Sequence, residues 1–232
     1  MTRMTGAALL VTAVLASGVM NGAAGQDKKD DNEAKRVADA TLVFNEIMDA
    51  GDSAIPSAIL DKAEGIAIFP TTIKAGLLVG GQRGRGILSV RSDGGTWSAP
   101  AFLTLTGGSV GLQIGAQAAD LVLVIMNRRG LENLVRNQFK VGADASVAAG
   151  PVGRDAQAST DIQMRAQILS YSRARGVFAG VTINGSTIRQ DRDANQRFYG
   201  KPYGTKQIVF ERLGGAPEPV AAWRNTLNKY TN

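Results

Sequence analysis

The side chains that could do chemistry in this sequence are cations, and the chemistry they offer is the binding of anions. The spacing predicts a β-hairpin whose strands, 73–81 and 86–91, flank a glycine-bearing turn at 82–85. Four basic side chains belong to this hairpin: Lys74, Arg83, Arg85 and Arg91. Cations gathered on one exposed hairpin attract anionic groups such as phosphate headgroups.

A second cationic group lies at the start of a predicted helix, residues 33–50. Val37 and Phe44 belong to an apolar stripe that recurs at helical spacing, and Lys35 and Arg36 stand near the beginning of the helix. Two interpretations of the stripe are open. Either it packs on a sheet, or it lies in the interface of a bilayer with the two basic side chains on the headgroups.

The residue types exclude several common kinds of catalytic site. The sequence contains no histidine and no cysteine, which removes Cys/His zinc sites, Ser-His-Asp triads, cysteine nucleophiles and disulfides. The carboxylates do not have the spacing of a calcium loop, and no general base is identifiable beside the serines. The glycine-rich run 80–86 lacks the Lys-Ser/Thr pair and the following helix of a phosphate-binding P-loop. We therefore expect no enzyme activity, no cofactor and no bound metal.

The overall charge agrees with an anionic partner. The 232 residues include 26 Lys and Arg against 20 Asp and Glu, a formal net charge of +6. Nucleic acid is not the expected partner, because basic residues are interspersed with acids, no Lys/Arg-rich run occurs and aromatic residues make up only 6%. An anionic membrane surface suits this charge better, since each basic residue near such a surface contributes about 1 kcal/mol.

The first 24 residues have the pattern of a secretory signal peptide. Arg3 precedes an apolar run over residues 6–20, and the small residues 22–24 follow it. The run is shorter than the roughly 20 residues that a membrane-spanning helix requires, and an uncleaved anchor is the alternative. Residues 25–32 are predicted to form a charged linker. These features predict export to the periplasm or cell envelope, with the protein peripheral to the membrane.

The elements that must position these residues are strands in the middle of the chain and helices at both ends. Apolar runs bounded by turn residues predict strands between residues 65 and 183, with helices at 128–137 and 218–230. Glycine accounts for 28 residues and lies within β-favouring runs, where it permits bulges and bends. We therefore predict an α+β fold for the single domain 33–232, with a strongly bent antiparallel sheet that is barrel-like if its edges close.

An ordered series of motifs along the chain resembles the SYLF domain. The series includes AEGIAIFP at 63–70, IKAGLLVGG at 73–81, GTWSAPAF at 95–102, VGADASVAAGPVGR at 141–154 and NQRFYG at 195–200. The resemblance extends over nearly all of residues 33–230 and implies lipid binding without catalysis. In eukaryotic members the ligands are phosphoinositides, and the N-terminal amphipathic helix, which corresponds to residues 33–50, is implicated in membrane attachment. Some fungal members bind actin, a partner that an exported bacterial protein would not meet.

The leading hypothesis is a non-catalytic envelope protein that reversibly binds anionic phospholipid or phosphoinositide-like headgroups. The candidate lipid-binding residues are Lys35, Arg36, Val37, Phe44, Lys74, Arg83, Arg85 and Arg91. Two alternatives remain: an envelope protein–protein interaction module, and a carrier that holds one acyl chain within the curved sheet. The leading hypothesis predicts salt-sensitive binding to anionic vesicles and little binding to neutral ones.

Overall fold

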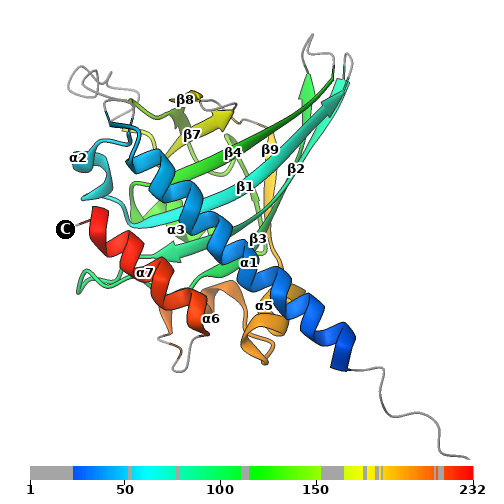
Figure 1. Ribbon diagram of the computed structural model, residues 1–232. Helices are drawn as coiled ribbons and strands as arrows, with labels where there is room; N and C mark the ends of the chain where they lie inside the picture. The colour runs from blue at the N-terminus through cyan, green and yellow to red at the C-terminus, as the bar shows by residue number, and fades with distance from the viewer. Residues whose placement is uncertain are drawn as a thin grey trace, which may run out of the picture.

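The computed structural model shows one curled β-sheet with helices packed against both of its faces (Figure 1). The residues that it describes are 23–51, 54–76, 79–110, 115–152, 165–174, 177–180, 183, 185–211, 213 and 217–231. Residues 1–22 of the predicted signal peptide lie outside this part of the chain. Among the described helices, none is both long enough and apolar enough to cross a membrane.

Nine described strands form the sheet in the order β5-β9-β3-β2-β1-β4-β7-β6, and β8 pairs with β7. Their bounds are β1 Gly65–Gly76, β2 Val79–Val90, β3 Ala101–Val110, β4 Gly115–Ile125, β5 Gln138–Lys140, β6 Val147–Ala149, β7 Ile168–Ala174, β8 Val177–Gly180 and β9 Ser186–Gln190. Neighbouring strands are antiparallel except for β6 and β7, which are parallel. The predicted α+β class and bent antiparallel sheet are confirmed. Within the described residues the sheet is curled and not closed, since its path ends at β5 and β6.

The N-terminal helix α1 (Ala23–Met48) begins well before the predicted start at residue 33. The segment 25–32, predicted as a linker, is therefore helical. After Gly25 this segment contains only polar and charged residues, without proline or a second glycine, so nothing in it interrupts the helix.

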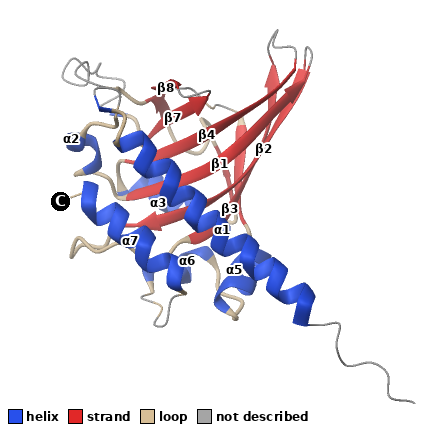
Figure 2. Ribbon diagram, in the orientation of Figure 1, coloured by secondary structure: helices blue, strands red, loops and turns tan. Residues whose placement is uncertain are grey.

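Helix α1 and the C-terminal helix α7 (Glu218–Tyr230) cover one face of the sheet, which we call the outer face (Figure 2). Phe44 of α1 meets Trp223 of α7 edge to face, with ring centroids 6.0 Å apart. The indole N–H of Trp223 donates a hydrogen bond to Ser89 Oγ on β2 at 2.8 Å. The apolar stripe of α1 thus packs on the sheet and on α7, which is the first of the two predicted interpretations.

The opposite face, which we call the inner face, encloses the other half of the core. The remaining helices are α2 (Ser57–Leu60), α3 (Arg128–Leu134), α5 (Arg192–Tyr199) and α6 (Thr205–Phe210). Leu131 of α3 and Ile208 of α6 are buried against this face, together with strand residues such as Phe69 and Leu123. The predicted C-terminal helix is confirmed, the helix predicted at 128–137 ends at Leu134, and α5 and α6 were not predicted.

The long strands β1 to β4 project beyond α1, and the projecting part of the sheet is curled (Figure 1). On the inner face Gln82 of β2 hydrogen-bonds Ser186 of β9 across the intervening strand β3. The two side chains meet over Gly107, where a Cβ atom would lie only 3.0 Å from Ser186 and 3.1 Å from Gln82. Glycine at this position therefore lets β2 and β9 approach each other, which makes the outer face convex.

Strand β2 runs straight through the turn predicted at 82–85, so that part of the hairpin prediction is wrong. The glycines that suggested a turn serve the packing of neighbouring strands. A Cβ atom at Gly86 would lie 2.5 Å from Phe69 Cδ1 on β1, where the register of β1 against β2 shifts between Ile68 and Ile73. The connection between β1 and β2, residues 77–78, lies outside the described residues.

Candidate anion-binding surface

Strand register places four cations together on the outer face of β2, β3, β9 and β5. One row across these strands contains Arg85, Thr104, Arg189 and Gln138, and the next contains Arg83, Thr106, Thr187 and Lys140. Residues paired directly across strands point to the same side of a sheet, and so do residues two apart along a strand. All eight side chains therefore share one face. We call Arg83, Arg85, Arg189 and Lys140 the basic strand face.

The cations of the basic strand face are exposed and have no acidic neighbour within these four strands. The side chains of Arg83, Arg85 and Lys140 form no hydrogen bond or ion pair with another described residue. Arg189 Nη2 donates to the neutral Gln138 Oε1 at 3.2 Å. A carboxylate oxygen of Asp144 accepts the backbone N–H of Lys140 at 2.6 Å. The positive charges of the face are therefore available to an external anion.

An exposed apolar side chain borders the same face. Ile73 of β1 pairs directly with Arg83, and its side chain is 51% exposed. Cations beside an apolar side chain suit the interface of a membrane, where the charges meet headgroups and the apolar group enters the boundary of the acyl chains. The arrangement offers electrostatic attraction of about 1 kcal/mol for each cation at an anionic surface.

The other cations of the predicted hairpin lie elsewhere. Lys74 pairs with Gln82, which is buried on the inner face, so Lys74 points away from Arg83. Arg91 lies past the opposite end of β2, where its Nη1 donates to the carbonyl of Asp61 at 2.9 Å. Of the four hairpin cations, only Arg83 and Arg85 belong to the basic strand face.

The apolar residues assigned to lipid on α1 are not available to it in this fold. The side chains of Val37 and Phe44 are fully buried in the outer-face core. Lys35 is exposed but forms an ion pair with Asp39 at 2.7 Å. The expectation that this face of the helix meets lipid is corrected, because the sheet and α7 already cover it.

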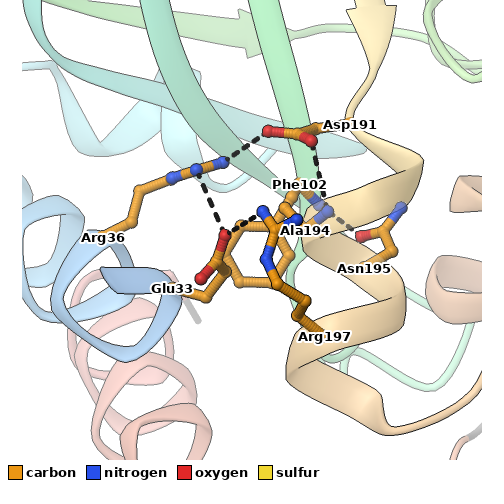
Figure 3. A network of polar contacts seen from close by, with 7 residues as sticks. All are labelled: Glu33, Arg36, Phe102, Asp191, Ala194, Asn195 and Arg197. Carbon is orange, nitrogen blue, oxygen red and sulfur yellow. Dashed lines mark hydrogen bonds and ion pairs between the residues drawn. The ribbon is translucent and has the colours of Figure 1, made fainter. Parts of the chain in front are cut away.

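Arg36 lies in a buried polar network between α1 and α5 (Figure 3). Its Nη1 donates to Asp191 Oδ2 at 3.0 Å, and its guanidinium lies 5.1 Å from the centroid of the Phe102 ring. Glu33 Oε1 accepts a hydrogen bond from Arg197 at 2.6 Å, which raises the pKa of Arg197. Only 6% of the Arg36 side chain is exposed, so its predicted role in lipid binding is corrected to a structural one.

A second basic surface forms a cleft of about 870 Å³ between α3, the start of α5 and α6. Its cations are Arg128, Arg136, Arg192 and Lys206. Two of them are engaged, because Arg128 pairs with Glu132 at 3.4 Å and Arg192 donates to Asn137 Oδ1 at 2.7 Å. Arg136 and Lys206 have no such partner among the described residues.

No cluster of three His, Cys, Asp or Glu side chains in the described part of the chain could hold a metal ion. Burial raises the pKa of Tyr171 and of Tyr199 above the ordinary value, so both phenols stay protonated near neutral pH.

Sequence reasoning missed Arg189 and Lys140. Their strands are short, 186–190 and 138–140, and they lie far along the chain from β2. The alternation around Ile188 could have indicated that Arg189 is exposed. Nothing in the sequence indicates which strands pair with β3.

Much of this chain is similar in sequence to known proteins. The Ysc84 family model, described as "Las17-binding protein actin regulator", matches residues 106–230. Protein YSC84 of Saccharomyces cerevisiae is 33% identical over 193 residues, covering 82% of this chain and 41% of that protein. SH3 domain-containing YSC84-like protein 1 of Homo sapiens is 34% identical over 194 residues, covering 82% and 56%. LAS seventeen-binding protein 3 of S. cerevisiae is 33% identical over 193 residues, covering 82% and 42%.

These matches agree with the motifs that resemble the SYLF domain. The chain spans about half the length of the curated relatives that it matches. One of these relatives is named as a binding protein, and the description of the family model also refers to binding. The family model covers more than half of this chain, and the chain therefore belongs to the Ysc84 family, which is characterised by the SYLF domain.

Proposed function

We propose that this protein reversibly binds anionic phospholipid headgroups through the basic strand face, without catalysis. The observation that carries this proposal is a set of four exposed cations on β2, β9 and β5, which together with the intervening strand β3 contain no acidic residue. Their charges supply long-range attraction, and the exposed Ile73 adds apolar contact at the interface. The lipid binding implied by the SYLF resemblance supports the same function.

Binding in this proposal leaves α1 on the sheet. Releasing α1 would expose Val37, Phe44 and Ile47, which are all fully buried, at about 1.5–3 kcal/mol for each side chain. It would also separate Arg36 from Asp191, with which it forms an ion pair at 3.0 Å. Contact through the basic strand face requires neither change, so α1 can stay packed on the sheet.

The test is co-sedimentation with phosphatidylcholine vesicles, with and without phosphatidylglycerol, at low and moderate salt. We expect binding only to the anionic vesicles, and weaker binding as salt screens the charges. The double variant Arg83→Gln/Arg85→Gln removes two cations, about 2 kcal/mol, and should weaken binding about 30-fold. Circular dichroism checks that the variant folds.

A matched variant separates the surface from net charge. Arg136→Gln/Lys206→Gln also removes two positive charges, but from the cleft beside α3 and α6. This variant should change vesicle affinity by less than about threefold if the basic strand face is the contact. Equal losses from both double variants would mean that net charge alone drives binding. A loss confined to the cleft variant would place the headgroup site there and contradict the proposal.

A protein partner is the second candidate function, because the description of the family model and the name of one relative refer to protein binding. An acidic protein surface would suit the same cations. Vesicle binding that survives Arg83→Gln/Arg85→Gln, together with loss of a purified partner, would favour this candidate.

Export to the periplasm or cell envelope, with the protein peripheral to the membrane, is a further part of the proposal. It rests on the pattern of residues 1–24. Cell fractionation of the full chain tests it, and recovery in the soluble cytosol would contradict it.

A further inference from the structure

A pocket of about 360 Å³ lies far from the basic strand face, where the end of β2 meets α6 and α7. Much of its wall is apolar, with Val90 and Trp97 from the β2–β3 region and Ile208, Phe210 and Leu213 from α6 and the residues after it. This volume falls near the lower end of small-molecule sites, which span about 300–1,000 Å³. The pocket therefore suits a ligand smaller than a two-chain phospholipid.

The polar groups of the β2–β3 wall are already hydrogen-bonded within the protein. The indole N–H of Trp97 donates to Thr231 Oγ1 at 2.8 Å. Ser92 Oγ and Thr96 Oγ1 share a hydrogen bond of 2.8 Å. Ser98 Oγ accepts the backbone N–H of Val90 at 3.0 Å and donates to a neighbouring carbonyl. These groups therefore have little need of hydrogen bonds from a ligand.

Arg224 of α7 is the exception in this pocket. Its Nε is buried without a hydrogen-bond partner, and its guanidinium forms no ion pair with any described residue. Three other arginines that are buried or partly buried, Arg36, Arg173 and Arg197, each have a carboxylate partner. A guanidinium presents parallel N–H groups that fit a carboxylate or phosphate, and a buried charge without a partner is unfavourable.

We propose that this pocket binds a single-chain anionic amphiphile, with a carboxylate or phosphate head on Arg224 and the chain along Ile208, Phe210 and Leu213. The head supplies the negative charge that Arg224 lacks, and the chain covers the apolar wall. The proposal does not depend on the proposed function, because this site lies beyond Val90 at one end of β2 while Arg83 and Arg85 lie along its projecting part.

Tryptophan fluorescence and calorimetry on the full chain test the proposal with sodium decanoate, below the concentration at which it forms micelles. The sequence contains two tryptophans; Trp97 lines the pocket and Trp223 is buried in the outer-face core. We expect saturable binding of decanoate, at least about tenfold weaker binding of the neutral decanol, and weaker binding of butanoate than of decanoate. Decyl phosphate in place of decanoate distinguishes a phosphate head from a carboxylate head, and binding of either supports the site.

Variants at Arg224 separate the charge from the apolar wall. Arg224→Gln should weaken the binding of decanoate at least about tenfold, to the affinity measured for decanol, while Arg224→Lys should keep part of the affinity for decanoate. Arg136→Gln removes an arginine elsewhere and should leave decanoate binding unchanged. Decanoate should raise the midpoint of thermal unfolding of the unmodified chain, and should raise that of Arg224→Gln less.

Three outcomes would overturn the proposal. The first is absence of binding by both decanoate and decyl phosphate. The second is equal affinity for decanoate and decanol, which requires no variant and so stands even if Arg224→Gln does not fold. The third is decanoate affinity that is unchanged in a folded Arg224→Gln variant.

Discussion

The arginines between α1 and α5 and the arginines on β2 and β9 have the same side chain in opposite surroundings. Arg36 is almost fully buried and pairs with Asp191 and Glu33, whereas Arg83 and Arg85 are exposed and have no carboxylate on their strands. The charged side chains that folding removes from water are paired with opposite charges, because a buried charge without a partner is costly. Charges left in water need no such partner, and these remain free for a ligand.

Arg173 on β7 is intermediate between the two groups. Its side chain is 23% exposed and forms ion pairs with Asp120 on β4 and Glu46 on α1. Burial alone would lower the pKa of Arg173, but the hydrogen bonds to Asp120 and Glu46 raise it overall. Arg173 therefore belongs with the structural arginines, and it connects α1 to β4 and β7.

The largest expected effect is on stability, from Arg36→Met. This change leaves Glu33 and Asp191 buried with fewer partners, and we expect a loss of about 3–5 kcal/mol in the free energy of unfolding, measured by urea denaturation. The matched change Arg83→Met on the outer face should alter stability by no more than about 0.5 kcal/mol. Similar losses from both variants would remove the distinction between the two groups of arginines.

A smaller loss in the free energy of unfolding is expected from Gly86→Ala, which tests how closely β2, the strand that contains Arg85, packs against β1. The added methyl group would overlap the Phe69 ring and the backbone of Ile68, and we expect a loss of about 1–3 kcal/mol. At Gly108 an added Cβ atom has no other atom within 4 Å, so Gly108→Ala is the control and should change the free energy of unfolding little. Thermal or urea unfolding of both variants decides the comparison.

Arg173→Gln should cost about 1–2 kcal/mol, since it removes charged hydrogen bonds to Asp120 and Glu46 that remain partly exposed to solvent. Vesicle binding should stay the same once folding is confirmed, because this charge is already neutralised. A selective loss of vesicle binding would move Arg173 into the ligand-binding group.

The smallest effect is expected from Lys74→Gln. Lys74 lies on the same strand pair as Arg83 but points to the other face, so its removal should lower vesicle affinity by less than about threefold. The single variant Arg83→Gln, with the same change of charge, should lower it about fivefold. Co-sedimentation of the two variants side by side measures the difference, and equal losses would show that the face of the strand does not matter.

Local pattern predicted much of the fold. The period of the apolar residues identified α1 and α7, and the alternation of apolar runs identified the strands of the core. The predicted turn at 82–85 was wrong because a glycine in a β-favouring run can mark either a turn or a close approach of neighbouring strands. Only the position of Phe69 beside Gly86 shows that the second case applies. Helices α5 and α6 were missed because they are short and depend on caps and tertiary contacts.

The candidate site was less predictable than the fold. Arg83 and Arg85 were identified because they lie in a segment predicted as an exposed turn. The segment is a strand instead, and both side chains stay on one face because they are two residues apart. Arg36 was assigned to lipid because its neighbours in sequence are basic, yet its partner Asp191 lies 155 residues away. Contacts of such separation have no local signature in one sequence.

The sequence by itself determined the net positive charge, the absence of thiol and imidazole chemistry, the amphipathic helices and the glycine-rich strands, since each of these depends on residue type or on short-range period. Only the tertiary structure decided which cations meet and which are neutralised. Pairing of β9 with β3 and of β5 with β9 adds Arg189 and Lys140 to Arg83 and Arg85, while packing of α5 against α1 brings the carboxylate of Asp191 to Arg36. The physical reason is that charges interact over distances in space, and folding sets those distances independently of separation along the chain.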